Sequence, residues 1–197
     1  MAHVCPWWFC YTFDNPLRRL VHNPEVMLAP WVRPGMTCLD LGCGMGYFTL
    51  GLAKLSRPGG RVVAVDLQEK MLAALRRRAS KAGLSQAIEP RRCAENSLGL
   101  DDLAGAVDFS LCFWMLHEVP SLADFLGQVL EATRPGGRLL VAEPKFHVDL
   151  KTFEGELAQA ETLGWQVAER PDIWGSFSAI LSPRQAAAQG VSQHAAA

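Results

Sequence analysis

The sequence has no long hydrophobic run and almost no net charge, and each absence argues against a class of protein. No stretch reaches the ~18–20 uninterrupted apolar residues of a membrane span, so no span is expected. Its 19 Lys+Arg and 20 Asp+Glu leave a formal net charge of −1, which argues against a nucleic-acid partner held through its phosphates. The apolar N-terminus lacks the basic region and small-residue cleavage site of a signal peptide. We therefore expect a soluble, cytoplasmic protein.

The six cysteines lack the spacing of a zinc site and of a secreted disulfide framework. Cys5 and Cys10 are five residues apart rather than in a C-x2-C pair, and no H-x3-5-H follows them. Cys38 and Cys112 lie in apolar runs, where buried, reduced thiols are the ordinary interpretation. No structural metal is expected.

Strand and helix patterns alternate along the chain at intervals of roughly 25–30 residues. Apolar runs predict strands at 37–41, 61–65, 87–91, 107–113, 138–142, 166–169 and 177–181. Helices are predicted at 15–28, 47–55, 69–81, 122–133 and 150–163. This order is typical of βαβ units in a parallel sheet, and the two closing strands predict an antiparallel hairpin at one edge. We expect a single α/β domain over residues 1–184, doubly wound and mostly parallel, followed by a disordered tail at 185–197.

The motif with the most chemical content is LDLGCGMG, residues 39–46, at a strand-to-helix junction. Its glycines allow the backbone to approach a ligand at the positive end of the following helix. The spacing is G-x-G-x-G, with Tyr47 where the dinucleotide fingerprint needs glycine. Asp40 adds negative charge beside the turn, which suits a cationic ligand better than a pyrophosphate. A nicotinamide oxidoreductase is therefore a weaker alternative.

Asp66 ends the second predicted strand, 24 residues after Gly42. A carboxylate there can accept hydrogen bonds from both hydroxyls of a ribose. Alone it could equally cap the next helix. Together with the glycine turn, the ribose role is favoured.

Five motifs in order resemble those of the class I S-adenosylmethionine-dependent methyltransferases, over roughly Pro30 to Pro144. They are LDLGCGMG, VVAVDLQEKML, CAENSL, VDFSLCFWMLHEV and RPGGRLLVAEP. The resemblance implies a Rossmann-like, seven-stranded fold, S-adenosyl-L-methionine as cofactor and S-adenosyl-L-homocysteine as product.

The same resemblance implies which residues contact the cofactor. They are Asp40, Gly42, Cys43, Gly44 and Gly46 for the methionine part, Asp66 for the ribose, Leu67, Ala94 and Glu95 for the adenine, and Cys112 and Phe113 beneath the cofactor. Cys93 stands where many relatives carry an aspartate that accepts from the adenine amino group. A thiol is a poor hydrogen-bond acceptor, so Glu95 or a backbone carbonyl is expected to accept from the adenine amino group instead.

Methyl transfer requires an aligned acceptor, exclusion of water and, for some acceptors, removal of a proton. The candidate catalytic residues are His117, after the fourth strand, and His147, after the fifth. The alternatives are a histidine packed beneath the cofactor for His117 and a plain surface loop for His147.

Residues 1–29 combine an aromatic segment with the first predicted helix and form a possible lid, with Tyr11 touching the bound cofactor. The aromatic side chains could instead cap the core, or form a dimer or membrane-surface contact. A further hypothesis has Cys5 and Cys10, with Cys43 or Cys93, binding arsenite as the substrate of a metalloid methyltransferase.

The acceptor is expected to be a small molecule. The aspartate-proline-proline-tyrosine signature of amino-methylating nucleic-acid enzymes is absent after the fourth strand, and little sequence separates the fifth strand from the next helix. A catalytically silent cofactor-binding domain, acting as a partner or sensor, is the alternative from another class. The acceptor atom and the oligomeric state stay open.

Overall fold

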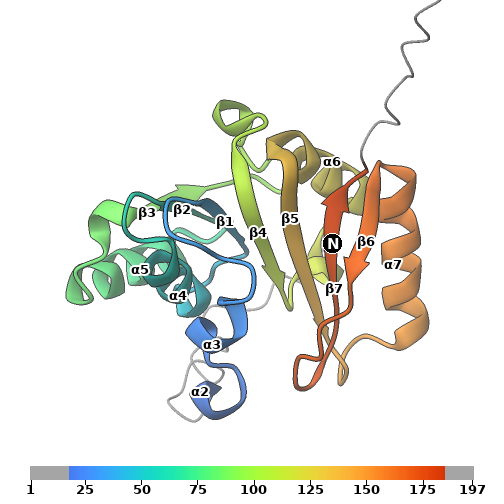
Figure 1. The fold of residues 1–197 in the computed structure, drawn as a ribbon, viewed down its shortest axis with the longest axis horizontal. Coiled ribbons are helices and arrows are strands. Elements are labelled where there is room, and N and C mark those ends of the chain that lie inside the picture. Colours follow the sequence, from blue (N-terminus) through green and yellow to red (C-terminus); the bar gives the residue numbers. More distant parts are fainter. Residues whose placement is uncertain (1–17, 185–197) are drawn as a thin grey trace, which may run out of the picture.

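A computed structural model describes residues 18–184, which form a seven-stranded sheet with helices on both faces (Figure 1). The strands are β1 Thr37–Leu41, β2 Arg61–Asp66, β3 Ile88–Arg92, β4 Val107–Phe113, β5 Thr133–Pro144, β6 Trp165–Glu169 and β7 Ser176–Pro183. The helices are α2 Arg18–Val21, α3 Pro24–Leu28, α4 Tyr47–Ser56, α5 Glu69–Lys81, α6 Leu122–Ala132 and α7 Leu150–Thr162. Short 3-10 turns are η1 Ser85–Ala87, η2 Asp101–Leu103 and η3 Leu116–Glu118.

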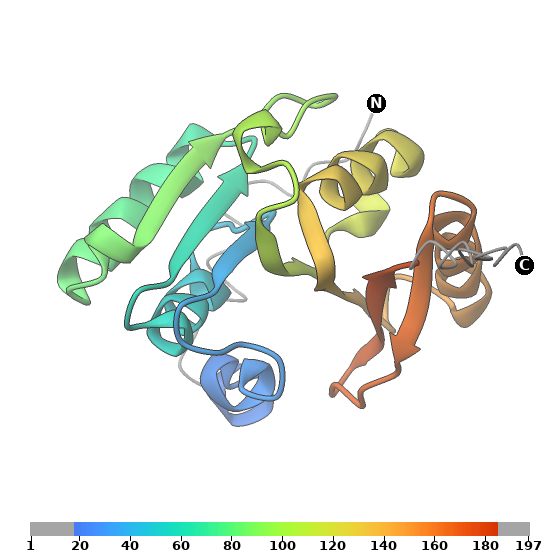
Figure 2. The ribbon, with the colours of Figure 1, turned by 45° about the horizontal axis from the view of Figure 1, so that its top comes forward.

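The strand order is β3-β2-β1-β4-β5-β7-β6. The pairs from β3 to β5 are parallel, whereas β7 is antiparallel to both β5 and β6. Figure 2 shows the β6–β7 hairpin beside α7 at one edge and β3 at the other. The predicted doubly wound, mostly parallel sheet with an antiparallel edge is therefore confirmed. The order reverses between β1 and β4, and ligands of such sheets bind beyond the carboxyl ends of the strands at that point.

The core lies on both faces of the sheet because successive strand side chains point to opposite sides. Leu39 and Leu41 of β1 belong to a buried cluster that includes Phe125 of α6. Cys38, on the same strand, belongs to a second cluster with Phe48 of α4. Helices cover both faces of the sheet, so a ligand site is left at the ends of the strands.

The single helix expected over residues 15–28 is wrong for its described part, which forms two short helices, α2 and α3. The Asn23 side chain caps α3, accepting hydrogen bonds from the backbone N–H of Glu25 at 3.1 Å and of Val26 at 3.4 Å. Pro24 follows at the first helical position, where its missing N–H costs nothing. Asn-Pro is a readable helix-start signal, so this break could have been predicted.

The expected lid segment falls largely outside the described residues, and Tyr11, Cys5 and Cys10 lie there with it, as does the tail at 185–197. Within residues 18–184, no helix has the length and apolar character to cross a membrane.

Candidate active site

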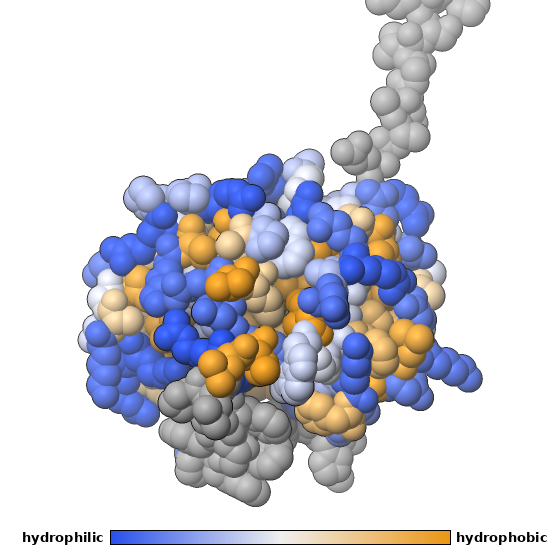
Figure 3. All heavy atoms as spheres, turned by 60° about the horizontal axis from the view of Figure 1, so that its bottom comes forward, coloured by the Kyte–Doolittle hydropathy of each residue, from blue (hydrophilic) through white to orange (hydrophobic). Residues whose placement is uncertain are grey.

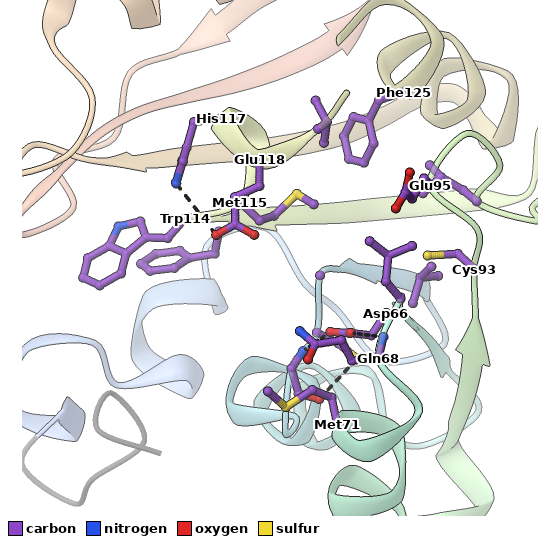
Figure 4. A pocket seen from close by; sticks show the side chains of 18 of the residues that line it. Asp66, Gln68, Met71, Cys93, Glu95, Trp114, Met115, His117, Glu118 and Phe125 are labelled. Carbon is purple, nitrogen blue, oxygen red and sulfur yellow. Dashed lines mark hydrogen bonds and ion pairs between the residues drawn. The ribbon is translucent and has the colours of Figure 1, made fainter. Parts of the chain in front are cut away.

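A cavity of about 610 Å³ opens at the carboxyl ends of β1, β2 and β4, where the strand order reverses (Figure 4). Its walls bring together eleven of the predicted site residues. These are Gly42, Cys43, Gly44, Asp66, Leu67, Cys93, Ala94, Glu95, Phe113, His117 and His147. The volume is that of a site for a drug-sized molecule, so one cavity has room for a cofactor-sized ligand.

The glycine turn forms one wall. Gly42, Gly44 and Gly46 all have positive φ, at 66°, 53° and 84°, a conformation that side chains rarely adopt. A Cβ on Gly46 would lie 2.3 Å from Cδ1 of Leu75, whereas a Cβ on Gly44 would meet nothing within 4 Å. Gly46 therefore permits close packing on α5, and Gly44 leaves open space on the cavity side.

Asp66 lies at the end of β2, facing the turn (Figure 4). Its Oδ2 accepts a hydrogen bond from the backbone N–H of Gly44 at 2.9 Å, and its Oδ1 accepts one from that of Gln68 at 2.8 Å. Burial raises the pKa of this carboxyl above its usual value, although both hydrogen bonds oppose the shift. Each oxygen keeps a further lone pair for a ligand hydroxyl.

Three predicted cofactor residues, Asp40, Gly46 and Cys112, are not on the cavity wall. Oδ2 of Asp40 accepts a hydrogen bond from the Thr49 hydroxyl at 2.5 Å, and burial raises the pKa of Asp40 to about 7. Asp40 thus joins β1 to α4 through Thr49, and its raised pKa disfavours a full negative charge. Cys112 is fully buried beneath the site, where burial raises its thiol pKa.

Aromatic side chains line another part of the cavity. Trp114 has φ of 57°, its indole Nε1 donates to Oγ of Ser176 at 2.8 Å, and its backbone N–H donates to the Ala142 carbonyl at 2.7 Å. Its ring stacks on Phe113 with centroids 5.2 Å apart and meets the edge of Phe146 at 5.4 Å. A bulky residue persists in this backbone conformation only where its surroundings hold it there.

Phe146 is 69% exposed although it lines the cavity. Among the described residues, it is one of a few large apolar side chains that are exposed. Figure 3 shows that apolar areas interrupt the hydrophilic surface on one face of the molecule. Trp114 and Phe146, whose rings stand at 89° to one another, give the cavity an apolar aromatic corner.

His117 in η3 lies next to the aromatic wall (Figure 4). Its Nδ1 is hydrogen-bonded to Oε2 of Glu143, a residue with no exposed surface. The other oxygen of Glu143 accepts from the backbone N–H of Leu116 at 2.9 Å. Since a carboxylate only accepts, Nδ1 carries the proton, and Nε2 of a neutral His117 is left as an acceptor.

Two further groups contact His117. Its Nε2 lies 4.0 Å from Oε1 of Glu118, and its ring centroid lies 4.7 Å from that of His147. Burial lowers the pKa of His117, but the hydrogen bond to Glu143 and the charges of nearby glutamates outweigh it and leave the pKa raised. The cavity holds a histidine whose tautomer is fixed by the hydrogen bond to Glu143.

Arg18, Tyr47, Trp114 and Met115 also line the cavity and were missed from the sequence. The guanidinium carbon of Arg18 lies 4.5 Å from the centroid of the Tyr47 ring and 5.5 Å from that of Trp114. Nothing local distinguishes Arg18 from its exposed neighbour Arg19, and only the fold brings α2 to the site.

A family model described as "Methyltransferase domain" matches residues 33–180, more than half of the chain. A ubiquinone biosynthesis O-methyltransferase of Methylocella silvestris is 33% identical over 165 residues, which are 83% of this chain and 59% of that protein. A demethylmenaquinone methyltransferase of Symbiobacterium thermophilum is 32% identical over 111 residues, 56% of this chain and 43% of that protein. The chain thus spans about half the length of these curated relatives.

The fold also matches solved structures. A SAM-dependent methyltransferase from Aquifex aeolicus superposes with a TM-score of 0.80 at 23% identity, covering 91% of this chain and 98% of that one. At this identity the likeness shows the fold alone.

Proposed function

The chain belongs to the class I S-adenosylmethionine-dependent methyltransferases, and from this premise we propose that it is an enzyme that methylates a small-molecule acceptor. The observation that carries the proposal is one cavity with the glycine turn and Asp66 on one wall and His117 on another. The first wall suits the cofactor of this family, and the second suits an acceptor.

The residues on the first wall fit S-adenosylmethionine. The oxygens of Asp66 have free lone pairs for the ribose hydroxyls, and Gly44 leaves open space beside them. The Arg18 guanidinium, held over the Tyr47 ring, is suited to the carboxylate of the methionine part. Leu67, Ala94 and Glu95 are proposed for the adenine, as expected from the motifs.

When bound, S-adenosylmethionine supplies an electrophilic methyl group, which carries the hard part of the chemistry. The chain has to orient the acceptor, exclude water and receive a proton. We assign the orientation to Trp114 and Phe146, and the proton of a hydroxyl acceptor to Nε2 of His117. His147, whose ring lies beside that of His117, is a second candidate for handling the proton.

An oxygen acceptor on an apolar, ring-containing molecule fits these walls best. The relative from Methylocella silvestris is an O-methyltransferase of ubiquinone biosynthesis, which supports an oxygen acceptor. The face of one ring and the edge of the other, from Trp114 and Phe146, support an apolar molecule that carries a ring. Both the acceptor class and a cytoplasmic location stay predictions.

The test is to incubate the protein with methyl-labelled S-adenosylmethionine and a panel of phenols, aliphatic alcohols, amines and arsenite. We expect labelled product from a phenol, and loss of at least ~10²-fold in kcat for His117→Asn with unchanged cofactor affinity. Cofactor binding without any product would support the catalytically silent alternative. Product from arsenite alone would favour the metalloid alternative, and absence of cofactor binding would overturn the proposal.

A further inference from the structure

Residues 93–98 lie between β3 and η2, and all of them line the cavity. Within them, the Ala94 N–H donates to the Ser97 carbonyl at 2.9 Å, and the Ser97 N–H donates to the Ala94 carbonyl at 3.3 Å. Glu95 and Asn96 therefore form the tip of a tight turn. We call residues 93–98 the adenine turn, after the part of the cofactor proposed to lie against it.

The adenine turn begins at a backbone hydrogen bond to β2. The N–H of Cys93 donates to the carbonyl of Asp66 at 3.1 Å. The carboxylate of the same Asp66 is proposed to bind the ribose. The start of the turn is thus fixed to the ribose end of the proposed cofactor wall.

The other end of the turn is held by Gln128 of α6. Its Oε1 accepts a hydrogen bond from the backbone N–H of Leu98 at 2.8 Å, across 30 positions of sequence. Its Nε2 donates to the carbonyl of Asp124 at 3.1 Å and, at the longer distance of 3.5 Å, to that of Asn96. The three partners agree on one orientation of the amide, because an N–H faces its oxygen and two carbonyls face its nitrogen.

Gln128 differs in chemistry from the residues around it on α6. Phe125 and Val129 are buried and apolar, whereas Gln128 is half-buried and lines the cavity. Figure 4 shows Phe125 on the side of the cavity where Glu95 lies. Leu98 is 8% exposed, so without Gln128 its N–H would have little access to water. An apolar side chain at position 128 would leave that N–H without its acceptor.

We propose, resting on the cofactor site proposed above, that Gln128 is a positioning residue for recognition of the adenine base. By holding the N–H of Leu98, it keeps the adenine turn where Glu95 or a backbone carbonyl accepts from the adenine amino group. Groups that recognise a ligand have to be held within about 0.5 Å of their productive positions. Gln128 thus acts through the turn and sets the preference for this base.

The direct test measures hydrogen exchange at the Leu98 amide by NMR, in the protein without any ligand. The protein is labelled at leucine, and the Leu98 signal is assigned by its absence in Leu98→Met. We expect Gln128→Met to accelerate this exchange about tenfold or more, because Met fills a similar volume without an oxygen acceptor. Gln128→Glu, whose carboxylate oxygen still accepts from this N–H, should keep the exchange rate within about twofold of the wild type.

Two comparisons separate a local effect from a loss of overall stability. The amide of Leu111, on the middle strand β4, reports opening of the whole sheet, and Gln128→Met should leave its exchange unchanged. Gln159→Met is the matched control, because Gln159 is an exposed glutamine on α7, and it should leave exchange at Leu98 unchanged. Unchanged exchange at Leu98 in Gln128→Met, or an equal acceleration at Leu111, would overturn the proposal.

The binding test uses S-adenosylhomocysteine and S-inosylhomocysteine, whose bases carry an amino group and an oxo group at the same position. We expect the wild type to prefer the adenine compound in calorimetry, and Gln128→Met to lose at least about threefold of that preference. Gln128→Glu and Gln159→Met should retain it. An unchanged preference in Gln128→Met would contradict the proposal, since a merely structural role would weaken the binding of both compounds alike.

Failure of this inference is distinguishable from failure of the proposed function. If the wild type bound neither compound, the proposed cofactor site and the role of Gln128 would both be overturned. If the wild type bound S-adenosylhomocysteine but methylated no acceptor, the proposed enzymatic activity alone would fail. The preference for adenine would then still decide the role of Gln128.

Discussion

Oδ2 of Asp66 accepts the backbone N–H of Gly44 at 2.9 Å, joining the end of β2 to the glycine turn that follows β1. The two residues are 22 positions apart in the sequence, yet the hydrogen bond aligns the carboxylate proposed to bind the ribose with the turn. This hydrogen bond thus joins the two parts of the proposed cofactor wall.

Replacing Asp66 with alanine should weaken binding of S-adenosylhomocysteine by about tenfold or more, the scale of one or two lost charge-assisted hydrogen bonds. Isothermal titration calorimetry measures this directly. Asp66→Asn, which retains one acceptor oxygen, should give an intermediate affinity. Unchanged affinity in Asp66→Ala would refute the ribose role.

Two glycines of the turn should respond differently to alanine. Gly46→Ala places a Cβ 2.3 Å from Leu75, so we expect it to lose about 1–3 kcal/mol more stability than Gly44→Ala in chemical unfolding. Both share the cost of a side chain at positive φ. Gly44→Ala should instead weaken cofactor binding, because its Cβ enters the open space of the cavity. Equal stabilities of the two variants would contradict the packing argument.

Asp40 should make stability depend on pH. Its pKa rises from an ordinary value of 3.8 to about 7 on folding, so between these values the folded state holds a proton that the unfolded state releases. The contribution of protonated Asp40 to the free energy of unfolding is therefore complete below pH 3.8. It is lost as the pH rises toward 7. Asp40→Asn, which cannot ionise, should therefore gain stability relative to the wild type from pH 5 to pH 8.

The size of that relative gain is a few kcal/mol, at about 1.4 kcal/mol per unit of pKa shift. Urea unfolding of both proteins at pH 5 and pH 8 measures this difference in the free energy of unfolding. The contributions of the other titrating groups cancel because both proteins contain them. A difference between the two proteins that does not change with pH would show that Asp40 is ionised in the folded protein.

The hydrogen bond from Trp114 to Ser176 should matter for the acceptor and not for the cofactor. Ser176→Ala leaves the indole N–H without this partner and frees the ring, so we expect KM for the acceptor to rise about threefold to tenfold, the scale of one hydrogen bond. Ser178→Ala is the control, because Ser178 is on the same strand and donates to the Pro171 carbonyl at 2.5 Å. Equal effects of the two variants on KM would contradict the role of Ser176.

The sequence predicted the strands closely because buried parallel strands appear as short apolar runs between turn residues. It also placed Asp66 and the glycine turn at one site, since the carboxyl ends of neighbouring parallel strands meet at one edge. The expected strand at 138–142 proved longer, as β5 begins at Thr133 and pairs irregularly with β4 before Arg138.

Most of the wall proposed for the acceptor could not be predicted, because it depends on contacts between distant segments. Trp114 and Ser176 are 62 positions apart, and His117 and Glu143 are 26 apart. Asp40 was expected beside the ligand since it precedes the glycines, but the alternation of side chains along β1 turns it toward Thr49 instead.

The antiparallel β5–β7 pair places Ser176 against the Trp114 ring, which is proposed to border the acceptor. Gly42, Gly44 and Asp66 come from the opposite half of the sheet. The two halves of the reaction are therefore encoded in separate stretches of the gene. If the proposed site is right, changes in the last strands alter which molecule is methylated and leave the proposed donor-binding half intact. A library randomised around β7 is the economical route to new acceptors on this scaffold.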